Sequence, residues 1–384
     1  MEKIVFELNN EQRKYLGLLP VESDWELVKL KDMYLYFDKE DIVRKKITVS
    51  ENQYLEQELY EKTTDNRTIL LPKTTKGKPK KLNFTATQSF SPFGVYLSFF
   101  SDYLSISNYT TQTSYFSTNL EDKTINGFKE WLNKWQKETT NDDLLDIENF
   151  KLSKRLNCKF KEGDFFSFKI GRRNWGFGRI LMDVAKLRKN QDFEANKNYG
   201  LKNLMGRPLI VKVYHKISDT ENIDLNELLS CDALPSQAIM DNHFFYGQNK
   251  IIGHKVLEYS DLDPLISYGK SINNNDRGTV YLQYGLIYKE VDVYKFDKYL
   301  ISRGKTKNGL YETSLYRNEG IGFGLDIDEL NECILEESNN PYWNGNDYMR
   351  KRDLRSPENF EFKKEIFSFF GLDANKSYEE NLKL

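Results

Sequence analysis

The sequence predicts a strand-dominated α+β protein, made of two β-rich units and a helical C-terminal extension. Aromatic residues are 14% of the 384 residues, with 24 Tyr and 25 Phe, and aromatic side chains favour the half-buried surface of a sheet. Runs that alternate apolar and polar residues recur along the chain, and stretches of helical periodicity separate or follow them. A chain of this length also exceeds what one hydrophobic core usually organises, so two domains are expected.

The first predicted unit covers residues 1–145. Residues 27–49 alternate in polarity around a turn-like segment, which is typical of antiparallel strands. Between residues 82 and 117 the three runs LNFTATQSF, GVYLSFF and LSISNYTTQTSYFS are rich in Thr, Ser and aromatic residues, and they predict three strands joined by short turns. In residues 124–138 five apolar side chains fall on one helical stripe, so an amphipathic helix closes the unit.

The segment after this helix is polar and acidic. Asp142 or Asp143 is a candidate cap for a short connecting helix, and we place the domain boundary between about residues 138 and 158.

The second predicted unit covers residues 158–320 and is a strongly curved, barrel-like antiparallel sheet. A helical turn and a Pro break within LNELLSCDALPSQAIM interrupt its strands. The strand candidates are residues 158–170, 208–217, 251–259 and 278–291, together with the WGFGRIL run at 175–181.

Residues 325–384 are predicted to form the helical extension. Asp326 has Glu329 three residues later, which is the arrangement of a capping box. Ser356 followed by Pro predicts a second helix start, and Gly371 predicts its end.

The segment GDFFSFKIGRRNWGFGRIL (163–181) contains four Phe, four Gly, three Arg and one Trp. Read with a period of two, Trp175, Phe177, Arg179 and Leu181 share one strand face, and Gly176, Gly178 and Ile180 share the other. Two glycines on one face let an aromatic ring or a crossing strand approach the backbone. The residues Arg172, Arg173 and Asn174 then form the tip of a hairpin, where they are available for function.

Candidate catalytic groups are sparse. The three histidines, His215, His243 and His254, lack the spacing of a metal site. The three cysteines, Cys158, Cys231 and Cys333, lie far apart, and we read them as reduced thiols of a cytoplasmic protein. The N-terminus lacks the pattern of a signal peptide, and no apolar run is long enough to span a membrane. We therefore expect no enzyme activity, no metal and no cofactor.

Two pairs of carboxylates leave a metal-dependent hydrolase open as an alternative. Asp261 and Asp263 precede a Pro, and Asp326 and Asp328 precede the predicted C-terminal helix. Carboxylates two residues apart at the end of a strand could hold Mg²⁺. No phosphate-cradling glycine loop accompanies either pair.

A lysine-rich segment leaves nucleic-acid binding open as another alternative. The segment has the character of an exposed basic loop, and Tyr109, Tyr115 and Phe116 would be the stacking aromatics beside it. The net charge of -2 disfavours this function, because nucleic-acid-binding domains usually carry a basic excess. The lysines concerned are Lys73, Lys76, Lys78, Lys80 and Lys81.

Four short motifs in the second unit resemble the Immunity protein 26 family of bacterial polymorphic-toxin systems. They are EGDFFSFKI, WGFGRIL, IIGHKVLEYSDLDP and VYLQYGLI, they occur in the family's order, and they span roughly residues 158–300. Two features depart from the family pattern: Tyr284 stands where a Trp is usual, and a long insert follows GRIL.

This resemblance implies a mostly-β cytoplasmic antitoxin that binds a cognate protein toxin and blocks it by occlusion, with no catalytic residue, cofactor or membrane contact. The residues we expect to bind the partner are Arg172, Arg173, Asn174 and Tyr284. The identity of the toxin and the oligomeric state are left open.

Overall fold

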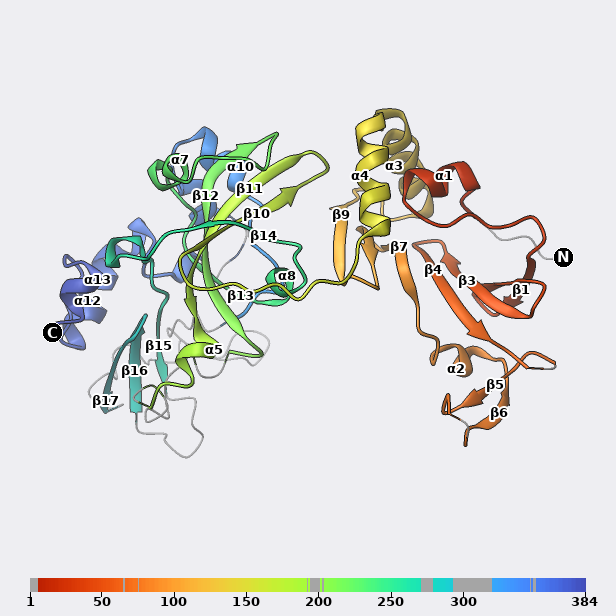
Figure 1. Ribbon diagram of the computed structural model, residues 1–384. Coiled ribbons are helices and arrows are strands. Elements are labelled where there is room, and N and C mark those ends of the chain that lie inside the picture. The colour runs from red at the N-terminus through yellow and green to blue at the C-terminus, as the bar shows by residue number, and fades with distance from the viewer. Residues whose placement is uncertain are drawn as a thin grey trace, which may run out of the picture. The chain divides into compact units, whose positions relative to one another are not determined.

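The computed structural model describes most of the chain (Figure 1), in two compact units. The first unit contains Met1–Asn157 and Tyr246–Gln248, and the second contains Cys158–Phe245 and Asn249–Leu384. The described residues are 6–64, 66–74, 76–191, 193, 201, 204–270, 279–292, 320–345, 347 and 350–384.

A seven-stranded antiparallel sheet organises the first unit, in the order β1-β2-β3-β4-β7-β8-β9. A separate two-stranded sheet is formed by β5 (Thr68–Leu71) and β6 (Lys78–Lys81). The strands of the large sheet are β1 (Glu26–Leu30), β2 (Met33–Phe37), β3 (Ile42–Ser50), β4 (Gln53–Lys62), β7 (Phe93–Phe100), β8 (Tyr103–Asn108) and β9 (Thr113–Asn119).

Helices cover one face of this sheet. They are α1 (Asn10–Tyr15), α3 (Ile125–Glu138) and α4 (Asn141–Leu152), and α3 and α4 bury Phe128, Leu132, Trp135 and Ile147 in the same core as the strands. The amphipathic helix predicted over 124–138 is therefore confirmed. On the opposite face a second core forms where β5 and the short helix α2 (Phe84–Thr87) meet β2, β3 and β4.

Three local predictions for this unit are wrong in detail. Residues 84–87 form α2 and not a strand, because the Asn83 side chain accepts a hydrogen bond from the Ala86 N–H at 2.9 Å and caps the turn. The N-cap of α4 is Thr140, and Asp143 supplies the reciprocal half of the capping box. Part of the lysine-rich segment is the strand β6 and not a loop.

A cluster of buried charges lies within the first unit. Lys45 Nζ is 2.6 Å from Glu56 Oε1 and 2.6 Å from Glu58 Oε1, and Arg13 Nε is 2.8 Å from Glu56 Oε1. All four side chains are nearly inaccessible to solvent. Removal of one partner would leave an uncompensated buried charge, so the cluster fixes how β3, β4 and α1 fit together.

The second unit contains a five-stranded antiparallel sheet in the order β13-β12-β11-β10-β14, and a three-stranded antiparallel sheet in the order β15-β16-β17. Among the described residues β13 and β14 are the two edges of the larger sheet, so the α+β class holds but a barrel-like closure is not confirmed. The strands are β10 (Asp164–Ile170), β11 (Asn174–Asp183), β12 (Pro208–Ser218), β13 (Gln237–Met240), β14 (Lys250–His254), β15 (Ile266–Lys270), β16 (Thr279–Tyr284) and β17 (Ile287–Asp292).

Short helices connect and cover these strands. Between the strands lie α5 (Val184–Leu187), α7 (Leu225–Ser230), α8 (Asn242–Phe245) and the 3-10 turn η2 (Tyr259–Asp261), and the C-terminal segment forms α10 (Leu330–Leu335), α11 (Asn340–Asn344), η4 (Arg350–Arg352), η5 (Pro357–Asn359), α12 (Phe360–Phe369) and α13 (Tyr378–Asn381).

The C-terminal helices share hydrophobic cores with the two sheets of the second unit. Leu330, Cys333 and Trp343 pack with residues of the five-stranded sheet, and Ile366 and Phe367 pack with β15, β16 and β17. Burial of these side chains makes the helices part of the folded unit, since apolar burial is the main source of its stability.

The start of the first C-terminal helix differs from the prediction. Glu329 is the N-cap residue of α10, and its side chain forms no cap hydrogen bond. Asp326 instead pairs with Arg350, with 2.5 Å between Nη2 and Oδ2. The predictions at the other helix agree with the structure: Ser356 precedes Pro357 at the start of η5, and Gly371 follows α12 with a φ of +75°.

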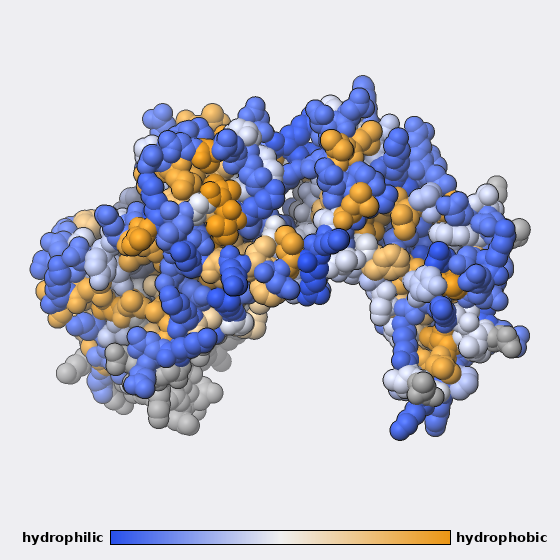
Figure 2. Space-filling model, viewed as in Figure 1, coloured by the Kyte–Doolittle hydropathy of each residue, from blue (hydrophilic) through white to orange (hydrophobic). Residues whose placement is uncertain are grey.

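On the face shown in Figure 2, hydrophilic residues cover most of each unit, with separate apolar patches between them. No helix within the described ranges is long and apolar enough to cross a membrane.

Candidate functional site

The hairpin of β10 and β11 is held by close contact between Phe rings and glycines. Phe166 pairs with Gly178 and Phe168 with Gly176 across the two strands. A Cβ added to Gly178 would lie 2.3 Å from Cζ of Phe166, and one added to Gly176 would lie 2.4 Å from Cζ of Phe168. The glycines therefore serve ring packing, as the strand pattern predicted.

The turn of this hairpin carries three of the four predicted partner-binding residues. Gly171 opens the turn with a φ of +60°, a conformation that glycine adopts without strain. Arg173 and Asn174 are exposed, and Arg172 is half-buried. The backbone oxygen of Arg172 accepts a hydrogen bond from Lys169 Nζ at 3.4 Å. The structure thus brings the three predicted residues together on a short turn above a packed base.

Trp175 lies beside this turn and contacts two further cations. The Nζ atoms of Lys169 and Lys250 lie 5.5 Å and 5.0 Å from its ring centroid, distances that suit cation–π attraction. Lys250 also pairs with Glu221, at 2.9 Å between Nζ and Oε2, and its side chain is 54% exposed. We define the hairpin face as the six residues Lys169, Arg172, Arg173, Asn174, Trp175 and Lys250.

Arg179, which lies on the same strand as Trp175, is the largest fully buried side chain that sequence reasoning left without a role. It is 1% exposed and stacks on Phe165, with 4.7 Å between its Cζ and the ring centroid. Its Nη1 is 2.9 Å from Asp261 Oδ1, and its Nη2 donates to the backbone oxygens of Lys255 and Val256 at 3.0 and 3.2 Å. Arg179 therefore fastens residues 255–261 to the sheet. An arginine inside an otherwise apolar strand was the sequence signal for this role.

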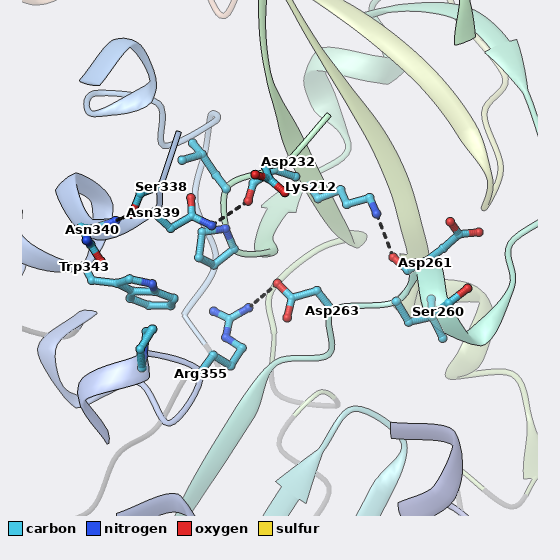
Figure 3. Close-up of a pocket in the computed structure, with 15 residues that line it drawn as sticks. Lys212, Asp232, Ser260, Asp261, Asp263, Ser338, Asn339, Asn340, Trp343 and Arg355 are labelled. Atoms are coloured by element: carbon cyan, nitrogen blue, oxygen red, sulfur yellow. Dashed lines mark hydrogen bonds and ion pairs between the residues drawn. The ribbon is translucent and has the colours of Figure 1, made fainter. Parts of the chain in front are cut away.

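A polar pocket of about 510 Å³ lies in the second unit (Figure 3). Segments far apart in the sequence line it: β12, the chain after α7, the chain around η2, and the C-terminal segment. The lining residues are Lys212, Asp232, Ala233, Leu234, Pro235, Ser260, Asp261, Leu262, Asp263, Ser338, Asn339, Asn340, Trp343, Arg355 and Pro357.

Residues 161–278 match the family model described as Immunity protein 26. The match confirms the resemblance seen in the sequence motifs, for this segment of the chain. No curated protein and no solved structure matches the chain. The Immunity protein 26 segment contains the whole hairpin face, Arg179, and the part of the pocket contributed by Lys212, residues 232–235 and residues 260–263. The remaining pocket residues come from the C-terminal segment.

Tyr284 lies outside the matched segment, on β16 of the three-stranded sheet, whereas the hairpin belongs to the five-stranded sheet. Its side chain is 8% exposed and packs against Phe367 and Tyr378, with ring centroids 5.3 and 4.9 Å apart. Burial raises the pKa of the Tyr284 hydroxyl to about 12. The ring belongs to the core between β16 and the C-terminal helices, so the structure does not place it on a surface with Arg172 and Arg173.

The carboxylates Asp261 and Asp263 both have arginine partners. Asp261 pairs with Arg179, and Asp263 Oδ2 is 3.2 Å from Arg355 Nη1 and accepts a hydrogen bond from the Ser236 N–H at 2.6 Å. Within the described residues no group of three or more metal-ligating side chains comes together. These contacts give both carboxylates a structural role in the matched segment.

The cysteine and histidines inside the segment are also held by structural contacts. Cys231 Sγ donates to the Glu227 backbone oxygen at 3.3 Å, and burial raises the pKa of its thiol, the opposite of what a nucleophile needs. His215 Nε2 lies 3.0 Å from Asn339 Oδ1, and His254 Nδ1 lies 2.8 Å from Asp164 Oδ1. Burial lowers the pKa of His243.

The aromatic rings proposed to stack on bases beside the lysine-rich segment are packed against other side chains of the first unit. Tyr115 is buried in the main core, Phe116 packs against Trp135 at 4.8 Å between ring centroids, and Tyr109 stacks on Tyr96 at 4.0 Å. These three rings are engaged within the fold. All five lysines are exposed, and one of them, Lys73, pairs with Glu61 at 2.6 Å between Nζ and Oε1; the others are Lys76, Lys78, Lys80 and Lys81.

Proposed function

We propose that this protein is a non-enzymatic immunity protein that binds a cognate protein toxin and blocks it by occlusion. The observation that carries the proposal is the location of the hairpin face, a partly exposed cationic surface inside the segment that matches Immunity protein 26. Function in the producing cell's cytoplasm, as part of a polymorphic-toxin system, belongs to the same proposal.

The hairpin face has the physical properties of a protein-binding surface. Its base is rigid, because the Phe rings of β10 pack directly on the glycines of β11. A rigid base reduces the conformational entropy lost on binding. The side chains of the hairpin face include two arginines and a tryptophan, residue types that often dominate the binding energy at interfaces.

The charge of this face indicates the chemistry of the partner. Four of its six residues are cations, Lys169, Arg172, Arg173 and Lys250, and Lys250 pairs with Glu221. An acidic surface on the toxin would therefore complement it, steer the encounter and make association sensitive to salt.

The lysine-rich segment supports no second proposal. Its exposed lysines supply charge, but the aromatic rings that were expected to stack on bases are packed within the first unit.

Coexpression with a toxin tests the function directly. The chain would be produced together with the product of the gene beside its own, and cell survival and co-elution of the two purified proteins would be measured. We expect the toxin alone to stop growth, coexpression to restore it, and the pair to elute as one complex. Failure to co-elute, or a neighbouring gene product without toxicity, would contradict the proposal.

A further inference from the structure

The pocket of about 510 Å³ is lined by charged side chains, none of which belongs to the hairpin face. Five of its lining residues are charged: Lys212, Asp232, Asp261, Asp263 and Arg355. Which ligand the pocket suits depends on which of these charges are already compensated.

Two carboxylates of the pocket are compensated. Asp261 Oδ1 is 2.9 Å from Arg179 Nη1, and its Oδ2 accepts a hydrogen bond from the Glu258 N–H at 2.9 Å. Asp263 Oδ2 accepts from the Ser236 N–H at 2.6 Å and lies 3.2 Å from Arg355 Nη1. Both carboxylates therefore act as fixed parts of the wall and repel an entering anion only weakly.

The arginine of the pocket is compensated as well. Arg355 Nη2 is 2.8 Å from Asp353 Oδ2, and Arg355 Nη1 also donates to the backbone oxygen and hydroxyl of Ser236 at 3.0 Å each. With two carboxylates and a carbonyl around it, this guanidinium holds the C-terminal segment against the sheet and does not serve as the anchor for a ligand.

Lys212 differs from these groups. Its Nζ donates one hydrogen bond, to the backbone oxygen of Asp261 at 3.0 Å (Figure 3). The same Nζ lies 5.5 Å from the Tyr214 ring centroid. It makes no ion pair within 4.0 Å among the described residues. An ammonium group has three N–H donors, so two remain for a ligand.

Burial of Lys212 strengthens the case for an anionic ligand. Desolvation lowers the pKa of its ammonium group and outweighs the attraction of Asp261 and Asp263, which acts in the opposite direction. An entering anion would form a direct ion pair with Lys212 in a partly desolvated site, where such pairs attract more strongly than in water. Ser260 and Asn340 add a hydroxyl and an amide to the lining.

We propose that this pocket binds a carboxylate, with Lys212 as its charged anchor. Asp232, an exposed lining residue without an ion pair among the described residues, adds a negative charge that disfavours polyanions. The carboxylate has two sources that share this chemistry: a free small acid, or an Asp or Glu side chain of the toxin. The second source rests on the proposed function, and the first does not.

The toxin source is geometrically consistent with the hairpin face. Arg179 on β11 lies directly opposite Lys212 on β12 in the strand register. Trp175 lies four residues before Arg179 on β11. Side chains an even number of residues apart share a strand face, so Lys212 and Trp175 belong to the same face of the sheet. An acidic partner surface that meets the hairpin face would then also approach the side of the sheet that holds Lys212.

Lysine footprinting of the full chain tests the proposal without a toxin. Lys212 would be acetylated with a limiting amine-reactive reagent, and its labelling rate would be measured by mass spectrometry in sodium glutarate, in the blocked peptide Ac-Ala-Glu-Ala-NH2, and in sodium chloride of equal ionic strength. We expect at least one carboxylate probe to slow labelling of Lys212 several-fold, with no equal effect at Lys216. Slowing by glutarate assigns a small acid, and slowing by the blocked peptide alone assigns a protein side chain.

Matched variants provide the second readout. Lys216 lies on the same strand but pairs with Glu227 at 2.5 Å between Nζ and Oε1, outside the pocket. In calorimetric titrations with the same probes, Lys212→Met should lose binding and Lys216→Met should keep it. Equal labelling rates of Lys212 in all three solutions would overturn the proposal, even if Lys212→Met failed to fold. That outcome would leave toxin binding by the hairpin face untouched.

Discussion

Substitution of Gly178 by Ala tests whether the glycines of the hairpin serve packing. The added Cβ would lie 2.3 Å from Cζ of Phe166 and 2.5 Å from the backbone oxygen of Lys212. Phe166 is fully buried in a core, and the Lys212 oxygen belongs to the neighbouring strand, so neither atom can move away freely.

Two opposing effects set the change in the free energy of unfolding that Gly178→Ala causes. Overpacking of a well-packed core typically costs about 1–3 kcal/mol. Replacement of Gly by Ala also restricts the unfolded chain, which favours the folded state by about 0.4–1 kcal/mol. We therefore expect a net loss of about 1–2 kcal/mol in the free energy of unfolding, or a fall in melting temperature of about 2–8 °C for a unit of this size.

Gly320 supplies the matched control. An added Cβ there meets no atom within 4 Å, so Gly320→Ala should change stability by less than about 0.5 kcal/mol. Melting of both variants would be followed by differential scanning calorimetry. A Gly178→Ala variant that melts together with wild type and Gly320→Ala would refute the packing role.

Three further predictions concern the first unit, the buried arginine and pH. Lys45→Met should destabilise the fold by about 3–5 kcal/mol in urea unfolding, because it leaves Glu58 without its buried partner, whereas the exposed Lys39→Met should have little effect. Arg179→Met should speed hydrogen exchange in residues 255–261, which Arg179 fastens to the sheet; unchanged exchange would contradict that role. Burial lowers the pKa of His243 below its ordinary value of 6.5, so the unfolded chain binds more protons and stability falls as pH drops below that value. His243→Gln should make the melting temperature less sensitive to acid, and an unchanged pH profile would count against this explanation.

The spacing of apolar residues in the sequence predicted the helices and strands that bury one face and expose the other. The helix at 125–138 and the paired glycines of β11 follow directly from apolar spacing. The strand β13 was missed because its four residues follow a Pro break and carry too little periodicity to be recognised. The helix α2 was missed because its Thr-rich sequence favours strands, whereas Asn83 caps it locally.

For the candidate site, too, the sequence predicted only what depends on neighbouring residues. The hairpin tip could be found from the sequence, since Arg172 and Arg173 fit neither face of a packed strand. The pocket could not, because Lys212, Asp263 and Arg355 meet only through tertiary packing of distant segments. The role of Arg179 also depends on Asp261, which lies 82 positions further along the chain and pairs with it at 2.9 Å. No spacing rule connects such residues.

Binding of the cognate toxin by a variant of the hairpin tip tests the central claim most directly. The double variant Arg172→Ala/Arg173→Ala removes two positive charges from the tip, and Lys186→Ala/Lys189→Ala removes two exposed charges at the other end of β11. The measurement is the Kd of each complex with the toxin, with melting temperatures as a check on folding. We predict that the tip variant binds at least about tenfold more weakly, which corresponds to about 1.4 kcal/mol, while the control variant binds as wild type does. Equal Kd values for both variants and wild type would contradict the account.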